Sequence, residues 1–239
     1  MGALTADRPK CLAELAGKRL LDWQLAALNS AGLHAITVIR GYRKELLSSA
    51  AYATLDNPSW ETSNMVATLS CAAHLLRRFS CVVSYSDIVY HPDHVRELAE
   101  AQGDVAICYD VLWETLWAAR FENPLTDAET FCHEDGWLRA IGDKTDNILN
   151  IQGQYLGLLK FTPTGWAASE EFLSKLSANE RSRIDVTSML RGLLKIGVKV
   201  WCVPVSGRWC EVDSDSDVRL YERLLSKLNN RKWDHDWRW

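Results

Sequence analysis

Short strand-like runs alternate with helical patterns along this chain. The stretch "HAITVIRGY" has the β-branched character of a strand, and "SCVVSYSD" reads as a second strand with an acidic end. Between such runs, "GKRLLDWQLAALNSAGL" places leucines on one helical face and ends at Gly32, as a C-capped helix does. The alternation predicts an α/β fold with a mostly parallel sheet, helices on both faces, and an active site at the carboxyl ends of the strands.

The composition excludes several classes of protein. The chain has 239 residues, a formal net charge of −4 and a pI near 5.9, so it carries no general basic surface for nucleic acid. Its seven cysteines form no CxxC pair and no zinc spacing, which indicates reduced thiols in a cytoplasmic protein. No apolar run approaches the roughly 18 to 20 residues that span a bilayer, so we expect no membrane insertion.

The sequence predicts one domain over residues 1–230, because no linker or low-complexity segment interrupts the pattern. The region from about 109 to 150 is expected to be an insertion with strands of its own. Its aromatic residues among acids suggest a lid on the acceptor side of a pocket. Residues 231–239, "RKWDHDWRW", form a Trp-rich tail to which the sequence assigns no role.

Three residues lie where this architecture would place a site. Lys10 follows a proline, Asp87 directly follows an apolar strand, and Asp213 ends a short strand just before a helix. Each has an ordinary alternative, which is a solvated surface lysine for the first and a turn or helix cap for each carboxylate. Together, two strand-end carboxylates and a loop ammonium suit a Mg²⁺ ion and a triphosphate. Asp215 and Asp217 are expected to cap the last helix instead.

A family resemblance is carried by six segments in order, namely "LTADRPKCLAELAGKRLLDWQLAALNSAG", "VIRGYRKE", "SNMVATL", "SYSDIVY", "GQYLGLLKFTPTGW" and "GRWCEVDSDSD". They resemble the nucleotidyltransferase superfamily of the MobA-like and sugar-phosphate type, in particular the cytidylyltransferases that act on phosphocholine or 2-aminoethylphosphonate. The resemblance implies a Rossmann-like fold. It also implies Mg²⁺-dependent transfer of CMP from CTP to a small phosphonate or phosphocholine, with release of pyrophosphate.

The resemblance also implies roles for individual residues. Lys10 would contact phosphates, Asp87 and Asp213 would hold Mg²⁺, and Asn64 would join Lys10 and Asp87 in binding the nucleotide. Lys144, in "IGDKT", lies where members carry a basic residue near the acceptor. A cationic acceptor would be recognised by aromatic faces, whose alternative role is ordinary core packing. The aromatic candidates are Tyr85, Tyr90, Trp113 and Trp117.

The resemblance fails at the front of the chain. Members of that family have an apolar strand and a G-x-G-x-R loop before the Leu-Thr and Pro-Lys elements. Here Met1 and Gly2 stand immediately after the place where that arginine should be. We expect either a start codon assigned too late or a truncated copy. A sheet without its first strand has unpaired edges, so the chain as written should be marginally stable and catalytically weak.

Two other functions remain open on the sequence alone. One is a sugar-1-phosphate nucleotidyltransferase, and the other is a non-catalytic nucleotide-binding remnant. The sequence does not settle CTP against UTP, because base choice depends on the shape of the pocket. It is compatible with a homodimer without requiring one.

Overall fold

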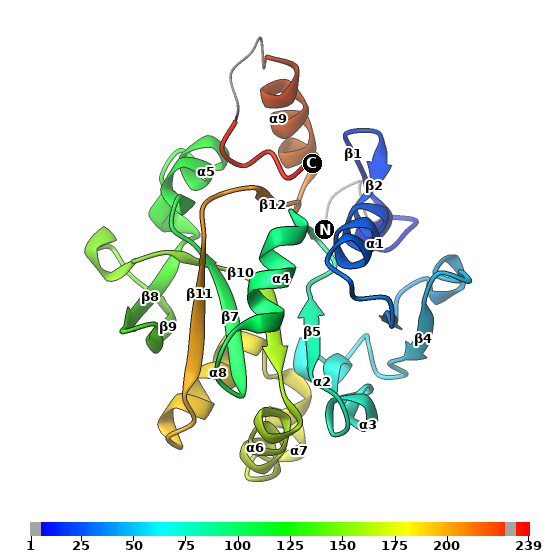
Figure 1. The fold of residues 1–239 in the computed structure, drawn as a ribbon, viewed down its shortest axis with the longest axis vertical. Helices are drawn as coiled ribbons and strands as arrows, with labels where there is room; N and C mark the ends of the chain where they lie inside the picture. The colour runs from blue at the N-terminus through cyan, green and yellow to red at the C-terminus, as the bar shows by residue number, and fades with distance from the viewer. Residues whose placement is uncertain (1–5, 228–232) are drawn as a thin grey trace.

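A six-stranded sheet runs through the middle of the molecule, with helices on both faces (Figure 1). The computed structural model describes residues 6–227 and 233–239. From edge to edge, the strands are β5 (Cys81–Ser84), β10 (Gln154–Phe161), β7 (Val105–Asp110), β11 (Val200–Val205), β9 (Trp137–Lys144) and β8 (Glu129–Glu134). The α/β class predicted from the sequence is confirmed.

Strand direction differs from the mostly parallel sheet that the sequence predicted. Within the described residues, β7 and β11 are paired in parallel, whereas the other four neighbouring pairs of this sheet are antiparallel. One cause is β10, which enters between β5 and β7 in the opposite direction. The other is the β8–β9 hairpin, whose turn residues Asp135 and Gly136 both have positive φ, at 51° and 78°. Such a turn favours a tight antiparallel hairpin.

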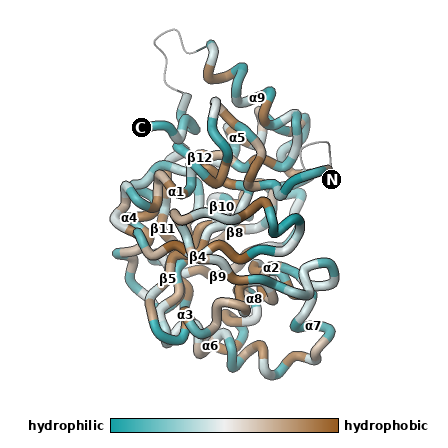
Figure 2. The backbone as a smooth tube through the Cα atoms, turned by 90° about the vertical axis from the view of Figure 1, so that its right-hand side faces the viewer, coloured by the Kyte–Doolittle hydropathy of each residue, from teal (hydrophilic) through white to brown (hydrophobic). Residues whose placement is uncertain are grey.

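Two hydrophobic clusters fill the two faces of the sheet. In β7, Ala106 and Cys108 belong to one cluster and Val105 and Ile107 to the other, as the alternation of side chains along a strand requires. Hydrophobic segments gather around these strands in the middle of the molecule (Figure 2). The expectation of helices on both faces is therefore confirmed.

The helices divide between the two clusters. Those that contribute to the first cluster are α1 (Leu20–Ser30), α4 (Pro92–Glu100), α5 (Trp113–Arg120) and α9 (Asp215–Ser226). Those that contribute to the second are α2 (Met65–Ser70), α3 (Ala73–Leu76), α6 (Pro163–Ser174) and α8 (Val186–Lys195), and a short helix α7 (Ala178–Arg183) lies against α2. Across the described ranges, no helix combines the length and the hydropathy that crossing a bilayer would need.

Two short strand pairs lie outside the main sheet near the start of the chain. They are the hairpin of β1 (Glu14–Leu15) with β2 (Lys18–Arg19), and the parallel pair of β3 (Thr37–Arg40) with β4 (Ala53–Asp56). In the part of the chain that the structure describes, β3 pairs with β4 alone and β5 with β10 alone, so each has one edge without a strand partner. The marginal stability expected from unpaired edges stays a prediction.

The described part of the tail, residues 233–239, packs against the body of the protein. Trp237 is fully buried, and its ring meets that of Trp23 edge to face at a centroid distance of 5.9 Å. His235 Nε2 lies 2.8 Å from Asp110 Oδ2, and both side chains are fully buried. The tail that the sequence left without a role is therefore a packing element, and residues 231 and 232 lie outside the described residues.

The buried His94 on α4 should make the stability of the fold depend on pH. Its ring is 4% exposed and lies 2.9 Å from the Gly207 carbonyl, and burial lowers its pKa to about 4. In the unfolded chain the pKa of this histidine is near 6.5, so on acidification the unfolded state takes up the proton before the folded state does. The contribution of His94 to stability is therefore complete above pH 6.5 and is lost as the pH falls towards 4. We expect the loss to reach about 3 kcal/mol.

Urea unfolding between pH 7 and pH 4 measures this dependence. His94→Gln should flatten the curve over this range, because an amide can still donate to the carbonyl and does not titrate. The matched control is His74→Gln, at an exposed site, which should leave the curve unchanged. Equal slopes for wild type and His94→Gln would show that His94 does not carry the effect.

Candidate active site

An antiparallel strand pair brings two distant segments of the chain together. It consists of β6 (Ile88–Tyr90) and β12 (Trp209–Glu211), with Glu211 opposite Ile88. One residue further along, the backbone N–H of Val212 donates to the Asp87 carbonyl at 2.8 Å. This ladder places Asp87, just before β6, close to Asp213, just after β12.

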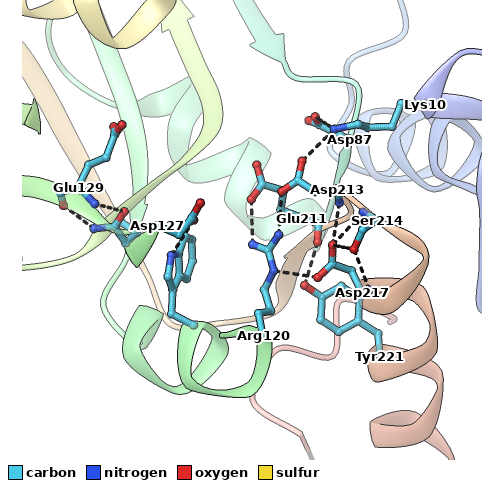
Figure 3. A network of polar contacts seen from close by, with 12 residues as sticks. Lys10, Asp87, Arg120, Asp127, Glu129, Glu211, Asp213, Ser214, Asp217 and Tyr221 are labelled. Carbon is cyan, nitrogen blue, oxygen red and sulfur yellow. Dashed lines mark hydrogen bonds and ion pairs between the residues drawn. The ribbon is translucent and has the colours of Figure 1, made fainter. Parts of the chain in front are cut away.

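Lys10 lies between these two carboxylates (Figure 3). Its Nζ donates to Asp87 Oδ2 at 2.9 Å and to Asp213 Oδ1 at 2.8 Å. Burial alone would lower the pKa of Lys10, but the two carboxylates raise it, so the ammonium stays charged at neutral pH. The structure therefore brings together the three residues that the sequence singled out, although their roles stay predictions.

Glu211 is a third carboxylate of this cluster that the sequence analysis missed. It stands two positions before Asp213, and residues two apart along an extended chain point to the same side. Burial, followed by the charge of Asp213, raises the pKa of Glu211. The spacing in "CEVDSD" was the signal that could have identified it.

The donor set fits a hard divalent cation. Asp87, Glu211 and Asp213 each offer a carboxylate oxygen, and these oxygens lie within 4.8 Å of one another. Asp87 Oδ1 is buried and has no hydrogen-bond partner within the described residues. A buried carboxylate oxygen without a partner is costly, and a coordinated cation would remove that cost. Mg²⁺ is the expected ion, because it binds through one or two carboxylates plus substrate phosphates.

Arg120 contacts the cluster from the side opposite Lys10, and the sequence analysis did not identify it. Its guanidinium extends from the end of α5 and donates to Glu211 at 2.9 Å, to Asp213 at 2.8 Å and to Asp217 at 3.1 Å. The Arg120 side chain is 2% exposed, so this ion network is screened little by solvent. Arg120 therefore fixes the positions of two of the three candidate metal ligands.

The turn into α9 also orders Asp213. Ser214 is the N-cap of this helix, and Asp217 completes a capping box with it. The carboxylate of Asp217 additionally accepts the backbone N–H of Asp213 at 3.0 Å. The prediction that Asp217 caps the helix is confirmed, and Asp215 lies in the first turn as expected.

A cavity of about 360 Å³ opens beside the carboxylate cluster. Glu211 and Asp213 form part of its wall. The rest of its lining combines charged, aromatic and small residues from β8, β9, β10, α5 and α8, and it includes Tyr85, Trp117, Asp127, Glu129, Lys144, Tyr155, Gly157, Asp185 and Arg191. Two members of the carboxylate cluster therefore face this cavity, where a bound cation could hold the phosphates of a small substrate.

Comparison with known proteins identifies the family. The family model described as "MobA-like NTP transferase domain" matches residues 1–144. The chain belongs to this family. It is therefore a nucleotidyltransferase, as its motifs predicted.

The names of individual similar proteins are consistent with this family. The CTP:phosphoglutamine cytidylyltransferase of Campylobacter jejuni is 32% identical, over 91% of this chain and 92% of that protein. The solved inositol-1-phosphate CTP transferase from T. maritima matches with a TM-score of 0.72 at 14% identity, over 94% and 91% of the two chains. The CTP:phosphocholine cytidylyltransferase from Streptococcus pneumoniae matches with a TM-score of 0.71 at 18% identity, over 94% and 93%. These two structures show the shared Rossmann-like fold.

The nucleotidyltransferase brings some of the predicted acceptor residues to the cavity and leaves others in the core. Tyr85, Trp117 and Lys144 line the cavity. Tyr90 is fully buried and Trp113 is 4% exposed, and both pack in the first hydrophobic cluster. The structure gives these last two a packing position, which is the alternative that the sequence analysis kept for aromatic residues.

Asn64 is engaged with the protein itself. Its side-chain oxygen accepts the Met65 N–H at the start of α2, and its amide donates to the Arg183 carbonyl at 3.1 Å. A contact between Asn64 and the nucleotide stays a prediction. The Leu-Thr element of the family resemblance, Leu4 and Thr5, lies outside the described residues.

Gly157 in β10 allows a close approach, though to a side chain. Its φ is +81°, and a Cβ atom there would lie 2.7 Å from the ring of Tyr85. The backbone N–H of Tyr85 donates to the Gly157 carbonyl at 2.9 Å. A glycine at this position therefore lets Tyr85 lie against β10 at the wall of the cavity.

Proposed function

We propose that this nucleotidyltransferase transfers CMP from CTP to a small phosphorylated or phosphonate acceptor, with Mg²⁺, and releases pyrophosphate. The observation that carries the proposal is the cluster of Lys10, Asp87, Glu211 and Asp213, of which Glu211 and Asp213 line the cavity. The 32% identical relative supports CTP as the nucleotide, because its name is CTP:phosphoglutamine cytidylyltransferase. Phosphocholine and a phosphonate are the acceptors that the sequence motifs suggest.

The chain's own groups account for most of the chemistry. In such a transfer, an acceptor oxygen attacks the α-phosphorus of the nucleotide, and pyrophosphate leaves. Asp87, Glu211 and Asp213 would hold Mg²⁺, which supplies positive charge to the triphosphate when bound. Lys10 would donate to phosphate oxygens, since its ammonium already stands between two of these carboxylates. Arg120 keeps Glu211 and Asp213 in place while the phosphates react.

A pyrophosphate assay with several nucleotides and acceptors tests the proposal. CTP, UTP, ATP and GTP are each incubated with Mg²⁺ and with phosphocholine, 2-aminoethylphosphonate or glucose 1-phosphate. The proposal expects release with CTP and a small phosphorylated or phosphonate acceptor. Release with glucose 1-phosphate alone would assign a sugar-1-phosphate nucleotidyltransferase. Nucleotide binding without release from these or any other phosphorylated acceptor would support the non-catalytic remnant.

Lys10→Met should change two ligand affinities in opposite directions. We expect CTP binding to weaken about tenfold or more, because a charge-assisted hydrogen bond from the ammonium to a phosphate oxygen is lost. We expect Mn²⁺, a spectroscopic substitute for Mg²⁺, to bind the nucleotide-free protein more tightly, because the ammonium no longer occupies Asp87 Oδ2 and Asp213 Oδ1. Calorimetry measures the first effect, and electron paramagnetic resonance of Mn²⁺ measures the second.

Lys18→Met is the matched control for this experiment. Lys18 lies over the ring of Trp23 at 4.3 Å from its centroid, and no contact with the carboxylate cluster involves it. Removing this charge should leave both affinities within about twofold of wild type. Unchanged Mn²⁺ binding in Lys10→Met would contradict direct competition between the ammonium and the metal.

A further inference from the structure

The end of the cavity away from Lys10 is lined by charges of both signs. Glu129 begins β8 and lies opposite Lys144 at the end of β9, while Asp185 caps α8 and Arg191 lies on α8. Figure 3 shows Glu129 and Asp127 on one side of Arg120, with Lys10 and Asp87 on the other. A phosphoryl group held at the carboxylate cluster would therefore leave the rest of an acceptor among these charges.

The acids at this end have unused hydrogen-bonding capacity. Glu129 is half-buried, and its carboxylate oxygens accept no hydrogen bond from the described residues. Burial raises the pKa of Glu129, while the nearby cations Lys144 and Arg191 lower it. Asp185 uses Oδ1 to accept the Ser188 N–H at 2.6 Å. The remaining acceptor atoms suit an ammonium group, which offers three donors.

The cations at this end have partners that a ligand can replace. Lys144 donates to the Asp127 carbonyl at 2.7 Å, which is a neutral partner. Arg191 pairs with Asp143, whose side chain is 64% exposed, and donates to Ser188 at 3.2 Å. An exposed ion pair is worth little, so exchanging it for a ligand carboxylate costs little. The planar guanidinium can bind such a carboxylate through two hydrogen bonds.

A buried hydroxyl on the cavity wall also lacks a partner. The Tyr155 hydroxyl is inaccessible to solvent and makes no hydrogen bond within the described part of the chain. Tyr155 lines the same cavity as Glu129 and Arg191. A buried hydroxyl without a partner costs about 1 to 3 kcal/mol.

We propose that this end of the cavity binds a zwitterionic group, so that the acceptor is a phosphorylated amino acid. Glu129 and Asp185 hold the ammonium. Lys144 and Arg191 hold the carboxylate. The inference rests on the proposed function, because the phosphoryl group of the same molecule must reach the carboxylate cluster. A purely cationic acceptor leaves the two cations unmatched, and an uncharged sugar leaves all four charges unmatched.

Four phosphate monoesters of similar length test the proposal. O-phosphoserine carries both charges, phosphoethanolamine lacks the carboxylate, 3-phosphooxypropanoate lacks the ammonium, and ethyl phosphate lacks both. Glutamine phosphorylated on its side-chain amide supplies a longer zwitterion. With CTP and Mg²⁺, we expect kcat/KM for the better zwitterion to exceed that of each single-charge analogue about tenfold or more. A ratio below about two would overturn the proposal.

Two variants test which residue recognises the carboxylate of the acceptor and which recognises its ammonium. Arg191→Met should reduce the preference for the zwitterion over phosphoethanolamine about tenfold, without changing KM for CTP. Glu129→Gln should reduce the preference over 3-phosphooxypropanoate to a similar degree. An equal loss for every acceptor in either variant would show a structural role and contradict the subsite.

Binding separates failure of this proposal from failure of the proposed function. Calorimetry with a non-hydrolysable CTP analogue measures acceptor affinity even where turnover is absent. No pyrophosphate from any acceptor, together with tighter binding of the zwitterion, would overturn the proposed function and support the subsite. Turnover of ethyl phosphate as fast as that of O-phosphoserine and phosphorylated glutamine would overturn the subsite and support the proposed function.

Discussion

Asp87→Asn is expected to lower kcat/KM for CMP transfer by about 10²-fold or more. Asparagine keeps the size of the side chain but removes the charge that faces Lys10 and the buried Oδ1 that lacks a partner. Both the proposed metal and the triphosphate depend on that charge. Steady-state kinetics at saturating acceptor measures the loss, and urea unfolding should show little change in stability.

Asp215→Asn is the matched control for this carboxylate. Asp215 lies in the first turn of α9, two positions after Asp213, and is not one of the clustered metal-binding candidates. We expect the activity of the Asp215→Asn variant to stay within about twofold of wild type. Its stability should fall by less than about 1 kcal/mol, because a favourable charge near the helix N-terminus is lost. Similar activities for Asp87→Asn and Asp215→Asn would contradict the assignment of Asp87 to the site.

Arg120→Met is expected to lower the free energy of unfolding by about 3 to 5 kcal/mol. The guanidinium is 2% exposed and neutralises Glu211, Asp213 and Asp217. Methionine fills part of the space but leaves the buried carboxylate of Asp217 and the partly exposed ones of Glu211 and Asp213 without their cation, and removing one partner of a buried pair is costly. Urea unfolding at neutral pH measures this loss.

Arg139→Met provides the comparison for an exposed ion pair. Arg139 bonds Glu134 at 2.7 Å, and the two side chains are 58% and 68% exposed. Such a pair contributes at most about 1 kcal/mol. A loss in Arg120→Met as small as that in Arg139→Met would mean that the buried network does not stabilise the fold.

The sequence was sufficient for the part of the site that depends on strand ends. Lys10, Asp87 and Asp213 each follow local signals, namely a Pro-Lys pair and acids directly after apolar strands. Their proximity depends on the pairing of β6 with β12, which the sequence analysis did not predict. The family resemblance implied only that Asp87 and Asp213 share a metal ion. Glu211 was also within reach, because it shares its side of the extended chain with Asp213.

Other features depend on contacts that no local pattern encodes. Arg120 reaches Asp213 from a helix 93 positions away in sequence. The antiparallel entry of β10 follows from tertiary pairing, since an apolar run does not specify direction. The sequence left the tail without a role because His235 is a polar residue, whereas the structure pairs it with Asp110 inside the core.

The most direct test of the central claim is ³¹P nuclear magnetic resonance of a reaction containing CTP, Mg²⁺ and a phosphorylated acceptor. The account predicts a new pair of coupled diphosphate signals, from CMP joined to the acceptor, together with an equal amount of pyrophosphate. Asp87→Asn should show neither within the same time. Folded wild-type protein that binds CTP but forms no such product with any acceptor would contradict the account.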